Sequence, residues 1–204
     1  MPKDSADKEI KMYLIAGLGN PGREYVGTRH NIGFEAADAL CSKFDIKFNK
    51  EKFRAVFGSG TIAGEKVIVA KPQTYMNLSG ESIIEVANFY KIKPDEILVI
   101  HDELELEPGI VSFKWSGGLG GHNGLRSTKQ VLNTPDFWRL RFGIGRPQND
   151  KMSVADWVLS KFSDEQQEIL QNVFSQTNFL LVKVLLSKNP ADYLQSWGKK
   201  KLVD

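Results

Sequence analysis

The chain has 204 residues, a formal net charge of +2, 41% hydrophobic residues and 25% charged residues. This length and composition predict one globular domain with a substantial core. The small net charge excludes a uniformly basic surface, so any contact with nucleic acid needs a local patch. The single cysteine, Cys41, excludes a disulfide framework and indicates a reducing compartment.

Both ends of the chain are polar. Residues 1–11 lack the apolar stretch of a secretory signal and predict a flexible extension, and residues 199–204 predict a solvated basic tail. No apolar run approaches the roughly 20 residues of a membrane span. We therefore expect a cytoplasmic protein without a membrane partner, whose single domain occupies residues 12–198.

Strand-like and helix-like segments alternate between these ends. Residues 63–65 resemble a hairpin turn, so the pattern predicts an α/β fold in which helices surround a twisted, mixed β-sheet. Strands are expected at Tyr13–Gly17, Ala55–Ile62, Lys66–Ala70, Ile97–Ile100, Val111–Lys114 and Leu140–Ile144. Helices are expected at Ile32–Phe44, Gly80–Tyr90, Gly124–Leu132 and Val154–Leu159.

A long C-terminal amphipathic helix is the last predicted element. It begins at Ser163, where Gln166 completes a capping box, and Asn189-Pro190 ends it. An apolar stripe of this width either packs on the sheet or binds a partner helix, and we expect packing on the sheet. The stripe consists of Ile169, Leu170, Val173, Phe174, Thr177, Leu180, Leu181, Val184 and Leu185.

The loop 17–31 joins the first predicted strand to the first predicted helix. It carries an amide (Asn20), a phenol (Tyr25), a guanidinium (Arg29) and an imidazole (His30). Open α/β sheets place their ligand crevices past the carboxyl ends of strands. These side chains are therefore candidates for a functional site.

The glycines of this loop also permit a second interpretation. The spacing Gly17-x-Gly19-x-x-Gly22 matches a dinucleotide fingerprint. In that fingerprint the helix starts within the motif and its N-terminus meets the pyrophosphate. Here the predicted helix starts only near His30, which argues against a dinucleotide site.

The three histidines, His30, His101 and His122, all fall at junctions beside an amide or a carboxylate. Asp102 follows an apolar strand, and a carboxylate at that position can accept the N–H of an imidazole. Such a bond fixes the tautomer and makes the other ring nitrogen a better base. The alternatives are structural or surface histidines, and a helix cap or solvated turn at Asp102.

A second glycine-rich stretch, 116–124, opens onto a predicted helix. It includes Gly121 and ends in His122, Asn123 and Gly124. Glycines let the backbone approach a ligand closely, and the N–H groups at a helix start suit anionic oxygens. A flexible connector has the same pattern, but the histidine and asparagine favour a site.

The segment 71–80 is a third junction. Tyr75 and Met76 are candidates for an apolar wall, and Asn77 either binds substrate or caps the next helix. The sequence shows neither metal-ligand spacing nor a nucleophile elbow, so we expect no metal and no cofactor. A set of asparagines, histidines and an aspartate suits attack of base-activated water on a carbonyl.

Basic residues gather in the second half of the chain. Arg139 and Arg141 alternate along a predicted strand and therefore share one face of it. Such a cluster is either a solvated face or, beside a site, a contact for phosphates. Its other members are Lys114, Arg126, Lys129, Arg146 and Lys151.

At these residues the sequence closely resembles bacterial-type peptidyl-tRNA hydrolase. The resemblance covers nearly all of the chain from about residue 12, and four motifs in order are far more specific than one. The motifs are Gly17-Leu-Gly-Asn-Pro-Gly22 with Tyr25 and Thr28-Arg-His-Asn31; Lys71-Pro72 through Thr74-Tyr-Met-Asn77 and Ser79-Gly80; His101-Asp-Glu-Leu104; and Gly117-Gly118 through Gly120-Gly-His-Asn-Gly-Leu125.

The resemblance implies a monomeric, metal-free esterase that cleaves the bond between a peptide and the 3′-terminal ribose of tRNA. It makes His30 the general base and Asp102 the group that orients it. The same resemblance implies that Asn20 and Asn77 bind the peptide backbone and that Asn123 places the substrate or the water. Met76, Gly121 and His122 would line the crevice. Tyr25 and Tyr75 would contact the tRNA 3′ end, and Lys114 and Arg141 would bind the 5′-phosphate. Lys151 follows the loop 148–150, which is shifted by one residue relative to the family pattern. Its contact with tRNA is therefore assigned only from its position in the sequence.

Two other functions remain open at this point. A non-catalytic RNA-binding relative of the same fold would explain the basic cluster equally well, and cleavage of N-acyl-aminoacyl-tRNA distinguishes it. A nicotinamide-linked oxidoreductase would explain the glycine spacing, and titration with NAD(H) distinguishes that function.

Overall fold

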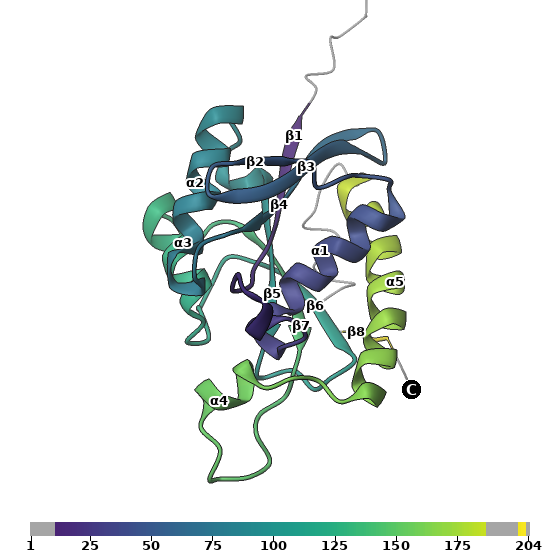
Figure 1. Cartoon of the computed structure of the whole chain (residues 1–204). Coiled ribbons are helices and arrows are strands. Elements are labelled where there is room, and N and C mark those ends of the chain that lie inside the picture. The colour runs from purple at the N-terminus through teal and green to yellow at the C-terminus, as the bar shows by residue number, and fades with distance from the viewer. Residues whose placement is uncertain (1–10, 187–199, 203–204) are drawn as a thin grey trace, which may run out of the picture.

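The computed structural model describes residues 11–186 and 200–202. Within these residues the chain forms one eight-stranded sheet in the order β2-β3-β4-β1-β5-β7-β6-β8, with helices on both faces (Figure 1). This is the α/β fold with a mixed sheet that the sequence predicts. Residues 1–10 of the predicted extension and the predicted helix end at Asn189-Pro190 lie outside the described residues. No helix in the described part is long and apolar enough to cross a membrane.

The strands are β1 (Met12–Gly17), β2 (Lys50–Lys52), β3 (Ala55–Ile62), β4 (Glu65–Pro72), β5 (Ile97–Glu103), β6 (Ile110–Trp115), β7 (Trp138–Gly143) and β8 (Lys200–Lys201). The α-helices are α1 (Ile32–Lys43), α2 (Ser79–Tyr90), α3 (Asn123–Leu132), α4 (Val154–Leu159) and α5 (Asp164–Leu186). Short 3₁₀ helices are η1 (Arg23–Tyr25), η2 (Arg29–Asn31), η3 (Met76–Leu78) and η4 (Pro94–Glu96).

The centre of the sheet is parallel. β1 lies between β4 and β5, and both pair with it in parallel; β7 extends the sheet in parallel beside β5. The outer pairs, including the predicted hairpin β3–β4, are antiparallel. Because β1 and β5 run parallel, their carboxyl ends meet at one edge of the sheet, where ligand crevices form.

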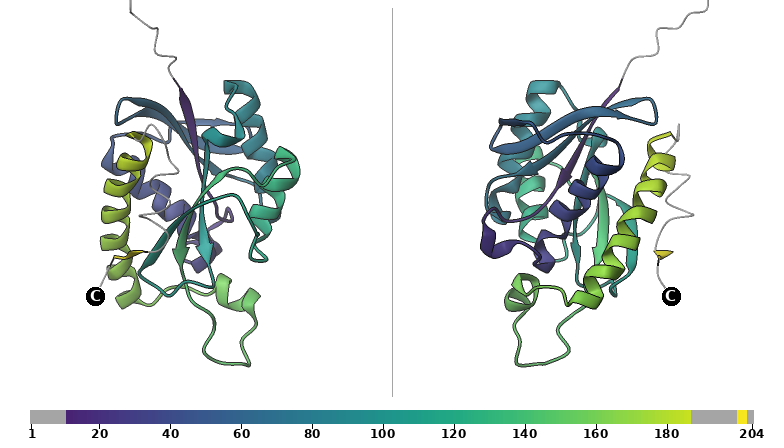
Figure 2. Two further views of the ribbon diagram at one scale, coloured as in Figure 1. Left: turned by 180° about the vertical axis from the view of Figure 1, so that it is seen from behind. Right: turned by 45° about the vertical axis from the view of Figure 1, so that its right-hand side comes forward.

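Two apolar cores flank the sheet. One contains buried residues of α1 and α5, and the other contains buried residues of α2. Figures 1 and 2 show α1 and α5 side by side on one face and α2 with α3 on the opposite face. Phe174 of α5 contacts Phe142 of β7, with their ring centroids 5.5 Å apart. The described part of the stripe, including Leu170, Val173 and Leu181, therefore packs on the sheet as expected.

The start of α5 also follows the sequence prediction. The backbone N–H of Gln166 donates to Ser163 Oγ at 3.2 Å, and the backbone N–H of Ser163 donates to Gln166 Oε1 at 3.1 Å. These two bonds form the predicted capping box. They satisfy N–H groups that would otherwise lack partners at the helix end.

The C-terminal segment differs from the prediction of a solvated tail, which is wrong for Lys200–Leu202. Lys200 and Lys201 pair with Val111 and Ile110 as strand β8, and the Leu202 side chain is only 8% exposed. The backbone N–H of Leu202 donates to Gly109 O at 3.0 Å. Backbone pairing with β6 is compatible with the exposed side chain of Lys201, because a strand at the edge of a sheet need not bury its side chains.

Candidate active site

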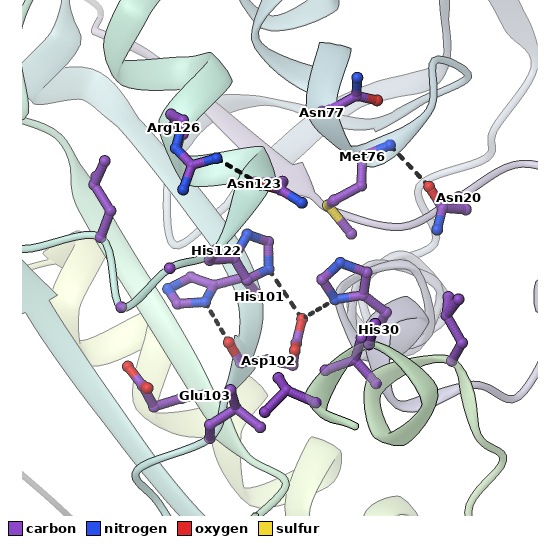
Figure 3. A pocket seen from close by; sticks show the side chains of 18 of the residues that line it. Asn20, His30, Met76, Asn77, His101, Asp102, Glu103, His122, Asn123 and Arg126 are labelled. Carbon is purple, nitrogen blue, oxygen red and sulfur yellow. Dashed lines mark hydrogen bonds and ion pairs between the residues drawn. The ribbon is translucent and has the colours of Figure 1, made fainter. Parts of the chain in front are cut away.

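One cavity of about 780 Å³ opens where the loops after β1 and β5 meet α3 and α4 (Figure 3). It brings together nine of the residues predicted from the sequence. They are Asn20, His30, Tyr75, Met76, Asn77, Asp102, Gly121, His122 and Asn123. The parallel strands explain this convergence, because polar residues that follow β1 and end β5 arrive at the same edge of the sheet.

His30 and Asp102 form the pair at the centre of this cavity. His30 lies in η2, Asp102 lies near the end of β5, and His30 Nδ1 is 2.8 Å from Asp102 Oδ1. Burial of Asp102 opposes its ionisation, but His30 and His122 more than offset that effect and hold the pKa of the carboxyl well below its usual range. An ionised carboxylate only accepts hydrogen bonds, so His30 Nδ1 carries the proton. His30 Nε2 is then the basic nitrogen.

His122 donates to the same carboxylate oxygen. His122 is the N-cap of α3, and its Nδ1 accepts hydrogen bonds from the backbone N–H groups of Gly124 (3.1 Å) and Leu125 (3.3 Å). The proton must therefore be on Nε2, which lies 3.0 Å from Asp102 Oδ1. These N–H groups at the helix start, expected from the sequence to suit a ligand anion, are occupied by a side chain instead.

The three groups also have the composition of a metal site. One atom each of His30, Asp102 and His122 lies within 4.8 Å of the others. A metal at His122 Nε2 would move the proton of that ring to Nδ1, where it would face the N–H groups of Gly124 and Leu125. The arrangement therefore fits a hydrogen-bonded network better than a metal centre.

His101 contacts this network through the backbone of Asp102. It is 1% exposed, and its Nδ1 donates to the backbone carbonyl of Asp102 at 2.6 Å. Burial lowers the pKa of His101 well below its usual value, so the ring stays neutral. Its Nε2 is buried and has no hydrogen-bond partner among the described residues, while its ring lies 4.9 Å from that of His122.

Asn20 connects two of the predicted motifs. Its Oδ1 accepts the backbone N–H of Met76 at 2.8 Å, so its amide nitrogen remains to donate into the cavity. The backbone of Asn20 is held by Asn31, which accepts the N–H of Asn20 at 2.8 Å and donates to its carbonyl at 2.9 Å. Asn31, in the same sequence motif as His30, therefore fixes the position of Asn20.

The other two asparagines are exposed at the cavity. Asn77 lies in η3, and α2 has no side-chain cap, so the alternative role of Asn77 as a helix cap is not observed. Asn123 Oδ1 accepts a hydrogen bond from Arg126 Nη1 at 2.8 Å. That bond leaves the Asn123 amide nitrogen toward the cavity (Figure 3).

The basic residues of β6 and β7 form a separate patch. Cross-strand pairing places Lys114 beside Arg139 and Ser112 beside Arg141. Arg139 is 1% exposed and donates to the carbonyls of residues 117, 118 and 135, so it holds the glycine-rich loop and does not reach solvent. Burial, together with Arg141 and Arg139, lowers the pKa of Lys114.

Arg141 connects this patch to the cavity. Its guanidinium is 3.2 Å from Glu103 Oε2 and donates to Ser112 Oγ at 2.8 Å, and Glu103 lines the cavity. Lys151 lies exposed in the loop between β7 and α4, outside the cavity. Tyr25 also lies outside it, but its ring contacts that of Tyr75 with centroids 6.5 Å apart.

Comparison with known proteins places this site in a family. The peptidyl-tRNA hydrolase family matches residues 14–202. A peptidyl-tRNA hydrolase of Clostridium botulinum is 48% identical over 166 residues, covering 81% of this chain and 86% of its own length. The chain belongs to the peptidyl-tRNA hydrolase family.

Further members of the peptidyl-tRNA hydrolase family are also similar to this chain. The protein from Caldanaerobacter subterraneus subsp. tengcongensis is 44% identical over 174 residues, which is 85% of this chain and 93% of that protein. The crystal structure of peptidyl-tRNA hydrolase from Acinetobacter baumannii superposes with a TM-score of 0.80 at 38% identity, covering 92% of this chain and 96% of that one. A crystal structure of a peptidyl-tRNA hydrolase in complex with N-propanol gives a TM-score of 0.83 at 38% identity, with coverage of 92% and 96%.

One wall of the cavity in this peptidyl-tRNA hydrolase family member was not predicted from the sequence. Helix α4 contributes the apolar side chains of Val154, Ala155, Val158 and Leu159, two of which are more than 40% exposed. Their i,i+4 spacing shows that Val154 and Val158 share one face, as do Ala155 and Leu159. That spacing was the available signal, but it does not distinguish a cavity wall from an ordinary core-facing stripe.

Proposed function

We propose that this member of the peptidyl-tRNA hydrolase family cleaves the ester between a peptide and the 3′-terminal ribose of tRNA, with His30 as the general base. The observation that carries the proposal is the His30–Asp102 hydrogen bond. It fixes the proton on Nδ1 and leaves Nε2 as the acceptor within a cavity lined by three asparagines. Such a base activates water without a cofactor.

The reaction follows from these positions. His30 Nε2 removes a proton from water as the water oxygen attacks the ester carbonyl carbon, and the Asp102 carboxylate stabilises the resulting imidazolium. Amide N–H groups of Asn20 or Asn123 donate to the oxyanion that develops. When the carbon–oxygen bond to the ribose breaks, His30 returns the proton to the leaving oxygen, which yields tRNA and a peptide with a free carboxyl group.

The remaining residues account for substrate binding. Asn77, with Asn20 and Asn123, offers amide groups to the peptide backbone. Tyr25 and Tyr75, whose rings contact each other, are suited to stack on the bases at the tRNA 3′ end. Met76 and Gly121 also line the cavity.

The basic patch is suited to the other end of the acceptor stem. Lys114 and Arg141 lie on one face of the sheet and would hold the 5′-phosphate, with Lys151 as a further cation on the loop that precedes α4. We expect Lys114→Gln to weaken hydrolysis of 5′-phosphorylated substrate roughly 10–100-fold, because a charge-assisted contact contributes about 1.5–3 kcal/mol. Lys66→Gln, which alters an exposed cation on β4 outside this cluster, is the control. If Lys114→Gln has the same effect on a 5′-hydroxyl substrate, the assignment is wrong.

We further propose that the protein acts as a monomer, in the cytoplasm and without a metal ion. Side chains of a single chain complete the cavity, and the tautomer of His122 opposes metal binding. Peptidyl-tRNA is the product of interrupted translation, so its hydrolase is expected in the compartment of the ribosomes.

The decisive experiment is hydrolysis of N-acetyl-aminoacyl-tRNA by purified protein in the presence of EDTA. We expect cleavage by the wild type, no cleavage of unacylated aminoacyl-tRNA, and a loss of about 10²–10⁴-fold in kcat for His30→Ala with tRNA binding retained. The unacylated substrate lacks a peptide unit, which leaves site amides unpaired at about 1–3 kcal/mol each. Tight tRNA binding without any ester cleavage would favour a non-catalytic RNA-binding relative.

The loop after β1 does not have the geometry of a dinucleotide-binding site. Helix α1 begins at Ile32, well after the glycine spacing, and a Cβ on Gly17 would lie 2.2 Å from Gly33 O. Gly17 and Gly19 therefore serve close packing against α1, where a Cβ on Gly19 would meet the Phe34 ring. Saturable binding of NAD(H) at micromolar concentration would contradict this interpretation.

A further inference from the structure

Arg29 precedes His30 in η2 but points away from the cavity into the junction between α4 and α5. It is 5% exposed. Its Nη1 donates to Ser160 Oγ at 2.7 Å and to the backbone carbonyl of Lys161 at 2.6 Å. Its Nη2 donates at 3.1 Å to Oε1 of Gln166, the residue that closes the capping box of α5.

Aromatic rings enclose the same guanidinium. Its central carbon lies 3.8 Å from the ring centroid of Trp157 and 5.0 Å from that of Phe162. No carboxylate forms an ion pair with Arg29 among the described residues, and burial lowers its pKa. An apolar side chain would fill this space at a smaller desolvation cost. What a guanidinium adds is a rigid fork of donors that holds several groups in one geometry.

The backbone reinforces this connection. The N–H of Arg29 donates to Ser160 O at 3.0 Å, and the N–H of Phe162 donates to Gly27 O at 3.2 Å. Thr28 and Lys161 form an isolated β-bridge. The segment that carries His30 is therefore bonded to residues more than 130 positions further along the chain.

The junction held by Arg29 also anchors the apolar wall of the cavity. Trp157, under the guanidinium, belongs to α4, whose Val154, Val158 and Leu159 line the cavity. The indole N–H of Trp157 donates to Gly145 O at 2.8 Å, just after β7. Arg29 thus connects η2, to which it belongs, with α4 and the start of α5.

We infer that Arg29 is a positioning residue for hydrolysis, which fixes His30 relative to the α4 wall. The inference rests on the proposed role of His30 as the base. His30 is held from one side by Asp102 and from the other by the Arg29 junction. A displacement of about 1 Å between a base and the substrate it serves can reduce the rate about 10²-fold.

The test compares Arg29→Met and Arg29→Lys with Lys43→Met, which removes an exposed cation from the end of α1. We expect Arg29→Met to lower kcat roughly 10–100-fold with a much smaller change in KM, and to shift the pH dependence of kcat because the bond between His30 and Asp102 loosens. Arg29→Lys should recover part of kcat, and Lys43→Met should resemble the wild type.

A milder variant tests the same connection without removing the buried cation. Ser160→Ala deletes one acceptor of Arg29 and should lower kcat in the same direction by a smaller factor. In a double-mutant cycle, the effects of Ser160→Ala and Arg29→Lys should be less than additive in log kcat. If Arg29→Met does not fold, these two variants carry the test.

The outcomes separate the inference from the proposed function. If His30→Ala is inactive while folded Arg29 variants and Ser160→Ala keep the wild-type kcat and pH profile, the positioning role is overturned and the base assignment stands. If His30→Ala retains turnover, the base assignment fails and the positioning role fails with it.

Discussion

Asp102 uses a single carboxylate oxygen to accept hydrogen bonds from two imidazoles. Asp102→Asn keeps an oxygen in this place but removes the charge that stabilises protonated His30. We expect kcat to fall roughly 10–100-fold, less than for His30→Ala, because the asparagine oxygen can still orient both rings. The pH profile of kcat should move to lower pH, since the neutral amide no longer favours the imidazolium. Equal losses in kcat and in substrate affinity for both variants would instead indicate a structural role.

Asn20 divides its side chain between the fold and the cavity. Asn20→Asp keeps an oxygen for the backbone N–H of Met76, removes the amide donor and adds a negative charge at the cavity. We expect kcat/KM to fall at least roughly 10-fold, because one unmade hydrogen bond costs about 1–3 kcal/mol and the added carboxylate repels the developing oxyanion, while the retained bond to Met76 limits the fall in melting temperature. Steady-state kinetics with thermal melting checks both parts, and an unchanged kcat/KM would remove Asn20 from the catalytic set.

At the scale of secondary structure, the sequence predicts elements with a strong period and misses those without one. Helix α4 has the predicted bounds, and the capping box of α5 is observed at the predicted residues. Strand β2 is three exposed charged residues, Lys50–Lys52, and β8 is two lysines. Neither has an apolar pattern, because both are short edge strands defined by backbone pairing with a neighbour.

Substitution of the buried Leu202, which follows β8, tests whether the C-terminal segment packs against the rest of the protein. Leu202→Ala should lower the free energy of unfolding by about 2 kcal/mol, because it removes a buried side chain. Lys201→Ala, an exposed position in the same strand, should change it by no more than about 0.5 kcal/mol. Urea unfolding followed by circular dichroism measures both. Equal effects of the two substitutions would contradict a packing role for Leu202.

At the scale of the whole molecule, the sequence predicted which residues gather but not how each is used. The residues His30, Asp102 and Asn20 were found because each lies near the carboxyl end of a strand or in the loop that follows one, and parallel strands bring such positions together. The tautomer of His122 could not be predicted, because it depends on the two N–H groups at the start of α3. Arg139 looked like part of a phosphate contact, yet the glycine-rich loop encloses it. Burial of a long charged side chain depends on tertiary packing, which sequence spacing does not reveal.

Two groups make the stability of the whole protein depend on pH in opposite directions. Burial lowers the pKa of His101 well below its ordinary value, so below about pH 6.5 the unfolded chain binds a proton that the folded protein does not. Stability then falls as the pH decreases. Burial, with the charge of Asp38, raises the pKa of Glu35 to about 7, so between about pH 4.5 and 7 the folded protein holds a proton that the unfolded chain has released. This second effect lowers stability as the pH increases.

Substitution separates the two effects. His101→Asn can still donate to the backbone carbonyl of Asp102, and it should make the slope of unfolding free energy against pH less positive by up to about 1.4 kcal/mol per pH unit between about pH 5 and 6.5. Glu35→Gln should make the same slope more positive between about pH 4.5 and 7. The depressed pKa of Asp102 affects stability below about pH 5, where its carboxylate begins to be protonated in the unfolded chain, but this contribution is common to the wild type and both variants. Urea unfolding at several pH values measures the slopes. If the unfolding free energy has the same dependence on pH in the wild type and both variants, neither the burial of His101 nor that of Glu35 controls the pH dependence of stability.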